Sequence, residues 1–173
     1  MGDDQNPILA DYEKLARLRL IRTNKIGPAT YTRLLGRYST AQNALDYLAS
    51  EQPNLVVADE PSINAEFDAV EKFGGKFLFL GERNYPHRLA HIPDAPPVLA
   101  VKGNCKVYQN QTIGVVGARN ASASGLKLTR KVCSDLSAHQ VTIVSGLARG
   151  IDTEAHKASL TGGTIACLAG GLD

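Results

Sequence analysis

The sequence has no apolar run that approaches the ~20 residues that a helix needs to cross a bilayer. Its first residues, MGDDQNPILADYEK, are acidic and lack the apolar stretch of a secretory signal. Three cysteines, Cys105, Cys133 and Cys167, are an odd and widely spaced set, which does not suit a disulfide framework or a metal cluster. We therefore expect no membrane contact, a cytoplasmic location and buried, reduced thiols.

The sequence also lacks a catalytic or metal-binding constellation. It contains neither a G-x-G-x-x-G nor a P-loop motif, no G-x-S-x-G elbow and no acidic cluster that suits two metal ions. His87 and His91 have no third ligand close by, so we interpret them as surface residues. Ser145, Asp152 and His156 fall in one loop and one helix, where we interpret Asp152 as an N-cap and His156 as packed on its own helix. We predict no enzyme, no metal and no cofactor.

The length of the chain limits the number of domains it can form, and the distribution of charge indicates where a charged partner binds. With 173 residues and 43% apolar residues, it can form one or two ordinary globular domains. Residues 1–72 carry 8 Lys and Arg against 11 Asp and Glu, whereas residues 73–173 carry 11 against 6. The basic second half is where a polyanionic partner is expected to bind.

The first half reads as a small helical domain, residues 1–73. Apolar residues at helical spacing predict helices at Tyr12–Arg22, from Ala29 to about Tyr38, at Thr40–Ala49 and at Ser62–Phe73, with a short element at Asn54–Ala58. The turn Ile26-Gly27-Pro28 between the first two helices resembles a helix-hairpin-helix or SAM-like element. Such a turn can point backbone amides at a DNA phosphate, but more often it only connects packed helices. Gly74-Gly75 marks the end of this domain.

The second half, residues 74–173, reads as an α/β domain. Lys76–Leu80 and Val98–Val101 are predicted strands that extend the sheet, and we interpret Tyr85 between them as a structural anchor. Three apolar runs then alternate with two helical segments, at about 122–139 and 152–160. This alternation predicts a largely parallel sheet, with strands at Ile113–Val116, Val141–Val144 and Thr164–Leu168. We expect the sheet to continue beyond the last of these strands, because its edge would otherwise stay uncovered.

Two glycine-containing loops follow the first two parallel strands, and loops in this position share one edge of the sheet. Glycine lets backbone amides approach a ligand, and a helix N-terminus carries partial positive charge, so together they favour a phosphate. Arginine adds forked charged donors, and serine adds hydroxyl donors. The alternative is that the glycines only make turns and the arginines are solvated. The candidate phosphate-binding residues are Gly117, Ala118, Arg119, Ser122, Ser145, Gly146, Ala148, Arg149, Gly150 and Asp152.

Three sequence blocks resemble the DNA-processing protein A family (DprA, also called Smf). Val115–Arg119 with Ser122 and Gly125 resembles its V-G-S-R signature, and Ser145–Asp152 followed by Ala155-His156 resembles its S-G-L-A-x-G-I-D-x-x-A-H signature. An upstream block beginning at Tyr85-Pro86 also resembles the family, and the resemblance covers about residues 18–173. Ala118 departs from the usual Ser, which removes a hydroxyl donor but leaves Arg119 and the backbone donors.

The resemblance implies a Rossmann-like domain and a non-catalytic protein that binds single-stranded DNA. Such a protein protects incoming DNA during natural transformation (competence), helps load the RecA recombinase in DNA recombination and forms a homodimer. The family's fold continues beyond the strands seen here, in many members with a winged-helix domain. The alternative is a nucleotide-hydrolysing phosphoribohydrolase on a similar scaffold. Its P-G-G-x-G-T-x-x-E motif is not matched by Thr161–Thr164, which lacks the Pro and the Glu.

Overall fold

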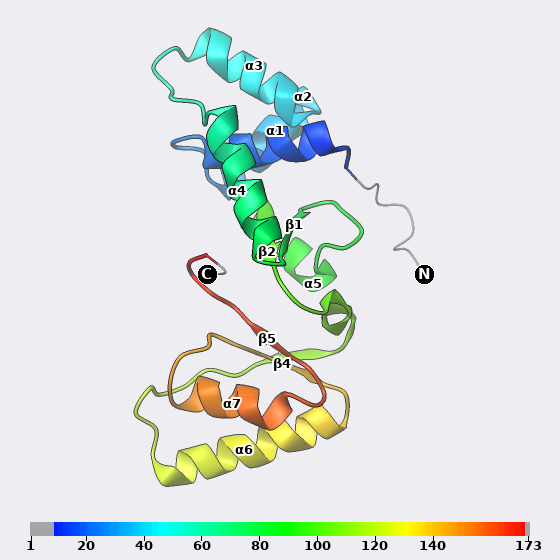
Figure 1. Cartoon of the computed structure of the whole chain (residues 1–173), viewed down its shortest axis with the longest axis vertical. Coiled ribbons are helices and arrows are strands. Elements are labelled where there is room, and N and C mark those ends of the chain that lie inside the picture. Colours follow the sequence, from blue (N-terminus) through cyan, green and yellow to red (C-terminus); the bar gives the residue numbers. More distant parts are fainter. Residues whose placement is uncertain (1–8, 172–173) are drawn as a thin grey trace. The chain divides into compact units, whose positions relative to one another are not determined.

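The computed structural model describes residues 9–171, which form two compact units that divide in sequence between Gly103 and Asn104. Figure 1 shows helices leading into a small hairpin in the first unit, and helices alternating with strands in the second. None of the helices within residues 9–171 is both long and apolar enough to span a membrane. The elements of the first unit are α1 (Asp11–Arg22), α2 (Pro28–Tyr38), α3 (Ala41–Glu51), α4 (Glu60–Lys72), β1 (Lys76–Phe79), α5 (His87–Ala90) and β2 (Val98–Val101).

Local signals explain where the first four helices begin. Thr40 caps α3, since its side chain accepts a hydrogen bond from the Asn43 amide, and Asp59 caps α4 by accepting from the Ser62 amide. Pro28 stands in the first turn of α2, where it lacks an amide that would be unpaired anyway. The all-helical prediction for this segment is confirmed, but the predicted element at 54–58 is irregular chain. Five residues are too few to propagate a helix between the turn at Pro53 and the cap at Asp59.

The hairpin β1–β2 belongs to the helical unit and does not extend the parallel sheet, so that expectation was wrong. The two strands pair antiparallel, from Lys76 opposite Val101 to Phe79 opposite Val98, in a two-stranded sheet of their own. Phe79 is fully buried in one cluster with Leu18 of α1 and Ile63 of α4. Burial of this ring against two helices places the hairpin on the helical unit.

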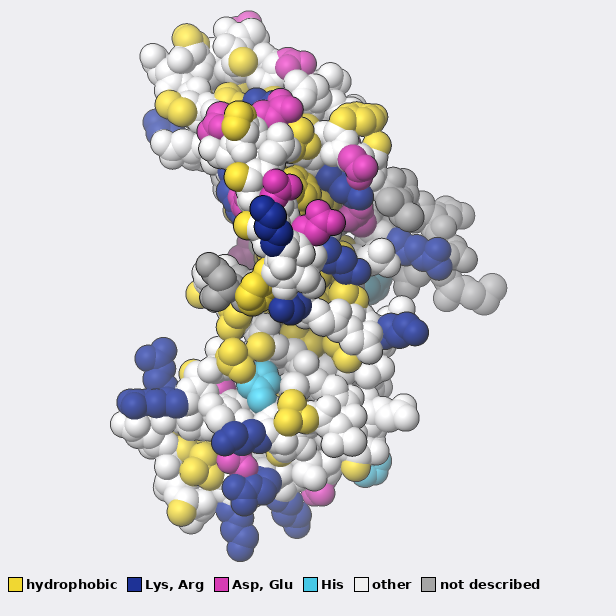
Figure 2. Space-filling view, viewed as in Figure 1, with side chains coloured by type: hydrophobic (Ala, Val, Ile, Leu, Met, Phe, Trp, Pro, Cys, Tyr) yellow, Lys and Arg dark blue, Asp and Glu magenta, His cyan; other side chains and the backbone are white. Residues whose placement is uncertain are grey.

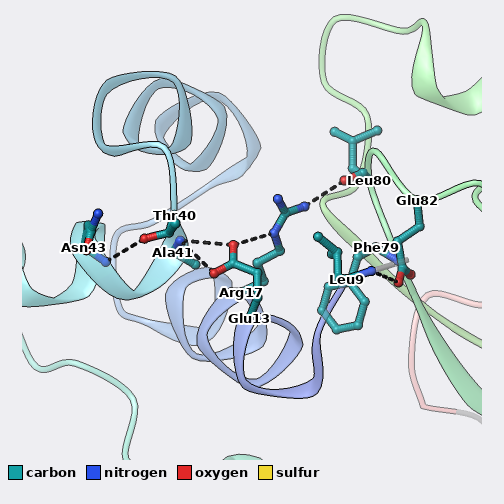
Figure 3. A network of polar contacts seen from close by, with 9 residues as sticks. All are labelled: Leu9, Glu13, Arg17, Thr40, Ala41, Asn43, Phe79, Leu80 and Glu82. Atoms are coloured by element: carbon teal, nitrogen blue, oxygen red, sulfur yellow. Dashed lines mark hydrogen bonds and ion pairs between the residues drawn. The ribbon is translucent and has the colours of Figure 1, made fainter. Parts of the chain in front are cut away.

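A polar network links three elements of this unit (Figure 3). The buried carboxylate of Glu13 on α1 accepts hydrogen bonds from the Ala41 amide, at 3.1 and 3.3 Å, and pairs with Arg17 at 2.9 Å. Arg17 also donates to the carbonyl oxygen of Leu80, just after β1. The network therefore connects α1 with the first residue of α3 and with the hairpin.

Along the second unit, three strands alternate with two helices. Its elements are a 3₁₀ turn η2 (Cys105–Gln109), β3 (Thr112–Gly114), α6 (Ala123–Ala138), β4 (Thr142–Ser145), α7 (Ile151–Ser159) and β5 (Thr164–Ala166). The strands are parallel and lie in the order β3-β4-β5, which confirms the predicted Rossmann-like α/β class. Sequential parallel strands joined by right-handed crossovers place both helices on one face, and Figure 1 shows α6 and α7 packed side by side.

The core of this unit lies between the sheet and its two helices. Cys133 of α6, Ile143 of β4 and Ala155 of α7 are buried together. The expectation of three buried thiols holds for Cys133 alone, because Cys105 is half-buried and Cys167 is exposed. Cys167 follows the last strand, beyond the part of the sheet that α7 covers, so its position in an apolar run did not predict burial.

Candidate functional site

The two predicted loops lie together at the carboxyl edge of the parallel sheet. β3 and β4 pair from Thr112 opposite Thr142 to Gly114 opposite Val144, so the loops that follow them, 115–122 and 146–150, start side by side. The Ile151 amide donates to the carbonyl oxygen of Ala118 at 3.2 Å, which joins the second loop to the first. The structure therefore brings all ten predicted residues to one edge.

Two glycines make this loop contact sterically possible. Gly150 has a φ of 84°, and a Cβ on it would lie 2.3 Å from the Ala118 carbonyl oxygen. A Cβ on Gly117 would lie 2.6 Å from the Cγ1 atom of Ile151. These glycines are required for the loops to pack against each other, and this requirement was not visible from their spacing.

The start of α6 offers free donors. The Ser122 hydroxyl caps the helix by accepting from the Gly125 amide at 3.1 Å, and it can still donate its own hydrogen. The amides of Ala123 and Ser124 have no hydrogen-bond partner within residues 9–171. The first turn of α6 can therefore bind an anion through two backbone amides and a capping hydroxyl.

The start of α7 offers fewer free backbone amides than the start of α6. This corrects the expectation that both helices direct unpaired amides at the ligand. The amides of Ile151, Thr153 and Glu154 already donate to carbonyl oxygens of the two loops. The N-cap is Gly150, so the prediction that Asp152 caps this helix was wrong. Asp152 lies inside the first turn, because the cap falls two residues earlier, at Gly150, which packs closely against the first loop.

Two further predicted residues support the loops instead of facing a ligand. The Ser145 hydroxyl is only 4% exposed and donates to the Val115 carbonyl oxygen at 2.7 Å, so it joins β4 to the end of β3. The buried carboxylate of Asp152 accepts from the Gly146 amide at 3.2 Å. Both groups are used internally, so we remove Ser145, and the Asp152 carboxylate, from the groups that can contact a phosphate.

Arg119 and Arg149 are the charged groups of the site that remain unpaired. Each is exposed, stands in one of the two loops and makes no hydrogen bond or ion pair with the described part of the chain. Residues 104–171 carry seven Lys and Arg against three Asp and Glu, and of those three acids Asp152 is buried and Glu154 pairs with Arg130. Figure 2 shows that Lys and Arg outnumber Asp and Glu on the displayed face of this unit. The unit that carries the two loops therefore has a net positive charge.

The contacts of His156 exclude a Ser-His-Asp relay with Ser145 and Asp152. The His156 side chain is buried, and its Nδ1 atom lies 2.7 Å from the Thr164 hydroxyl of β5. Burial lowers the pKa of this imidazole, against the smaller opposing effect of the Asp152 charge. His156 is thus a neutral residue that packs α7 onto β5, whereas the sequence led us to expect it to pack on its own helix. No group of three His, Cys, Asp or Glu within residues 9–171 is placed to hold a metal ion.

Outside the second unit, the structure also tests three structural interpretations. Tyr85 is buried and its hydroxyl donates to the Pro96 carbonyl oxygen at 2.6 Å, which confirms the structural anchor. His87 and His91 are exposed, as expected for surface residues.

The residue that sequence reasoning missed is Leu147, whose backbone lies in the left-handed region with a φ of 58°. No sequence signal marks this conformation, because glycine or asparagine is its usual sign.

Comparison with known protein families gives matches over both halves of the chain. A family model described as "DNA recombination-mediator protein A" matches residues 76–173, and one described as "DprA-like N-terminal HHH domain" matches residues 11–69. The DNA processing protein DprA of Streptococcus pneumoniae is 39% identical over 117 residues, which cover 66% of this chain and 39% of the relative. Protein Smf of Synechocystis is 30% identical over 184 residues, which cover 95% of this chain and 46% of the relative.

A solved structure is also similar. The X-ray structure of DprA from Streptococcus pneumoniae matches with a TM-score of 0.69 and 26% sequence identity, and the match covers 96% of this chain and 60% of that chain. The chain spans less than half the length of the two curated relatives described above.

Proposed function

Because this chain belongs to the DprA/Smf family, we propose that it is a non-catalytic protein that binds single-stranded DNA through its phosphates. One observation carries the proposal. Arg119 and Arg149 are exposed and unpaired on two loops that contact each other, beside the free first-turn amides of α6. Guanidinium groups and helix N-terminal amides are both suited to phosphate oxygens.

The phosphate-contacting groups of the proposed site are fewer than the sequence indicated. Arg119, Arg149, the Ser122 hydroxyl and the amides of Ala123 and Ser124 are available to a ligand. Gly117, Ala118, Gly146, Ala148 and Gly150 shape the loops, and Asp152 holds the Gly146 amide. These contacts recognise the backbone of the strand and not its bases, so binding is expected to be independent of sequence.

In the cell, we propose that the protein acts in the cytoplasm as a homodimer, protects incoming single-stranded DNA in natural transformation and helps load RecA. The likeness to DprA and Smf proteins supports this assignment. We also propose two functional domains, 1–73 and 74–173, and the family-model matches at 11–69 and 76–173 support this division. RecA filament formation on DNA coated with single-strand-binding protein tests the loading role, and sedimentation tests the dimer.

The test of the site is a titration of single-stranded DNA against the wild-type chain and Arg119→Ala. A charge-assisted hydrogen bond contributes about 1.5–3 kcal/mol. Since 1.4 kcal/mol is tenfold, we expect Arg119→Ala to weaken binding by about one to two decades. The thermal melt should stay close to wild type, because an exposed loop arginine contributes little to the core.

The matched control is Arg88→Ala, which removes the same charge from an exposed arginine of α5 in the other unit. Equal losses of affinity in both variants would reduce the site to a general charge effect, and unchanged affinity in Arg119→Ala would remove Arg119 from it. Mononucleotides serve as competing ligands in the same titration. Base release from nucleoside monophosphates would instead support the phosphoribohydrolase alternative, for which the contacts of Ser145 and His156 give no support.

A further inference from the structure

Each of the three loops that follow the parallel strands presents one exposed aliphatic side chain. Val116 follows β3 and is 83% exposed, Leu147 follows β4 and is 56% exposed, and Leu168 follows β5 and is 47% exposed. Parallel strands place these loops at one edge of the sheet, which is also the edge of Arg119 and Arg149. We call Val116, Leu147 and Leu168 the apolar rim.

Leu147 holds its place in the rim at a conformational cost. Its φ of 58° lies in the left-handed region, where a bulky side chain is disfavoured and glycine or asparagine is usual. The residues on both sides of it are fixed by α7. The Gly146 amide donates to the Asp152 carboxylate, and the Ala148 carbonyl oxygen accepts from both the amide and the hydroxyl of Thr153.

This arrangement indicates a role for the leucine side chain itself. If only the turn mattered, glycine or asparagine would satisfy the same backbone with less strain. A strained residue that its neighbours over-determine is typical of a binding site. Solvent exposure of the side chain means that it does not stabilise the core of this unit.

From these observations, and resting on the proposed function, we propose that the apolar rim contacts the bases of the single-stranded DNA whose phosphates the two loops bind. Val116 and Leu147 stand on the same two loops as Arg119 and Arg149, so a strand held there by its backbone has its bases close to aliphatic groups. Aliphatic side chains such as Leu pack against base faces in DNA complexes, and apolar groups also contact the thymine methyl.

The scarcity of aromatic residues in the second unit, residues 104–171, supports the same assignment. Tyr108 is the only Phe, Tyr or Trp in residues 104–171, and it lies before β3, towards the opposite edge of the sheet. Contacts with bases at the carboxyl edge must therefore come from aliphatic residues of this unit. Such contacts do not distinguish one base edge from another, so they add affinity without strong sequence preference.

The experiment compares two probes of equal length, an oligothymidylate and an abasic phosphodiester strand, with the whole chain. Wild type is expected to bind the oligothymidylate about tenfold more tightly than the abasic strand. Leu147→Asn should reduce this ratio to about threefold or less, because asparagine accepts the left-handed backbone but lacks the aliphatic surface. Its melting temperature should not fall, since the substitution relieves strain.

Two comparisons complete the design. Leu160→Asn is the matched control, because Leu160 is 70% exposed but follows α7, at the opposite edge of the sheet. Val116→Thr exchanges a methyl for a hydroxyl on the same β-branched skeleton and should also reduce the ratio. Arg119→Ala should weaken both strands equally, because both contain phosphates, and this result separates the phosphate site from the rim.

The possible failures are distinguishable. An unchanged ratio in Leu147→Asn, with the Arg119 effect intact, would overturn the base contact and leave the proposed function standing. An unchanged ratio accompanied by loss of dimer in light scattering would assign the rim to contact between copies of the chain. Lack of binding of wild type to either strand would overturn the proposed function and this inference together.

Discussion

His156 is a buried imidazole whose environment makes the second unit sensitive to acid. Its Nδ1 atom lies beside the Thr164 hydroxyl, while its Nε2 atom is buried without a hydrogen-bond partner among residues 9–171. Burial lowers the pKa of His156 below its ordinary value of 6.5. As the pH falls, His156 therefore becomes protonated in the unfolded chain before it does so in the folded chain.

We expect this difference to appear in the pH dependence of stability. The free energy of unfolding should be largest above pH 6.5 and should fall as the pH drops through 6.5 towards the lower folded pKa. In His156→Gln, which cannot titrate, the slope over this range should be shallower even if the variant is less stable at every pH. Urea unfolding at a series of pH values measures both slopes, and identical slopes would contradict the assignment.

At the scale of elements, the Glu13 network explains why α1, α3 and the hairpin act together. The carboxylate lies at the N-terminus of α3, where it satisfies the Ala41 amide, and it also orients Arg17 towards the Leu80 carbonyl oxygen (Figure 3). Loss of the carboxylate leaves the amide and the guanidinium without this partner in a buried place. Removal of one member of a buried polar set is costly, whereas an exposed ion pair contributes little.

Glu13→Ala is therefore expected to lower the free energy of unfolding by roughly 2–4 kcal/mol. Glu66→Ala is the matched control, because Glu66 pairs with Arg22 on the surface of the same unit and should cost under about 1 kcal/mol. Urea unfolding measures the free energy of unfolding of each variant. Hydrogen exchange at the Ala41 amide should be accelerated in the first variant only, and equal costs in both variants would show that the network contributes no more than a surface pair.

For the whole molecule, the unequal charge of its two halves predicts how DNA binding responds to salt. Residues 73–173 carry the net positive charge, with 11 Lys and Arg against 6 Asp and Glu, whereas acids outnumber bases in residues 1–72. Binding through phosphates releases counterions, so the logarithm of the affinity for single-stranded DNA should fall linearly with the logarithm of salt, with a slope of about −0.7 per phosphate contact.

Arg119→Ala should make this slope shallower by about 0.7, since it removes one contact. Arg88→Ala, in the other unit, should leave the slope unchanged. Fluorescence anisotropy at several salt concentrations measures these slopes. A flat response of the wild-type chain would mean that contacts with bases, and not phosphates, dominate binding.

The sequence by itself determined the order of the elements, the parallel sheet and the edge at which the site lies. These features follow from local pattern, because alternation of apolar runs with helical segments and the position of loops after strands do not depend on distant residues. The same reasoning placed Arg119 and Arg149 in the two loops at this edge and His156 on the helix that follows, but it did not foresee the contact of His156 with β5. It also predicted the helical first domain, whose caps at Thr40 and Asp59 are local signals.

Only the tertiary structure decided which polar groups remain available to a ligand. Ser145 and Asp152 look like ligand contacts in the sequence, but the Ser145 hydroxyl donates to the Val115 carbonyl oxygen, 30 residues away, and the Asp152 carboxylate accepts from the Gly146 amide. The hairpin joined the helical unit because Phe79 is buried against α1 and α4, which strand propensity cannot foresee. Burial and many hydrogen-bond partners depend on contacts between segments remote in sequence, so no local pattern contains them. The left-handed turn at Leu147 depends on how the residues beside it bond to α7, which the pattern of apolar and polar residues does not show either.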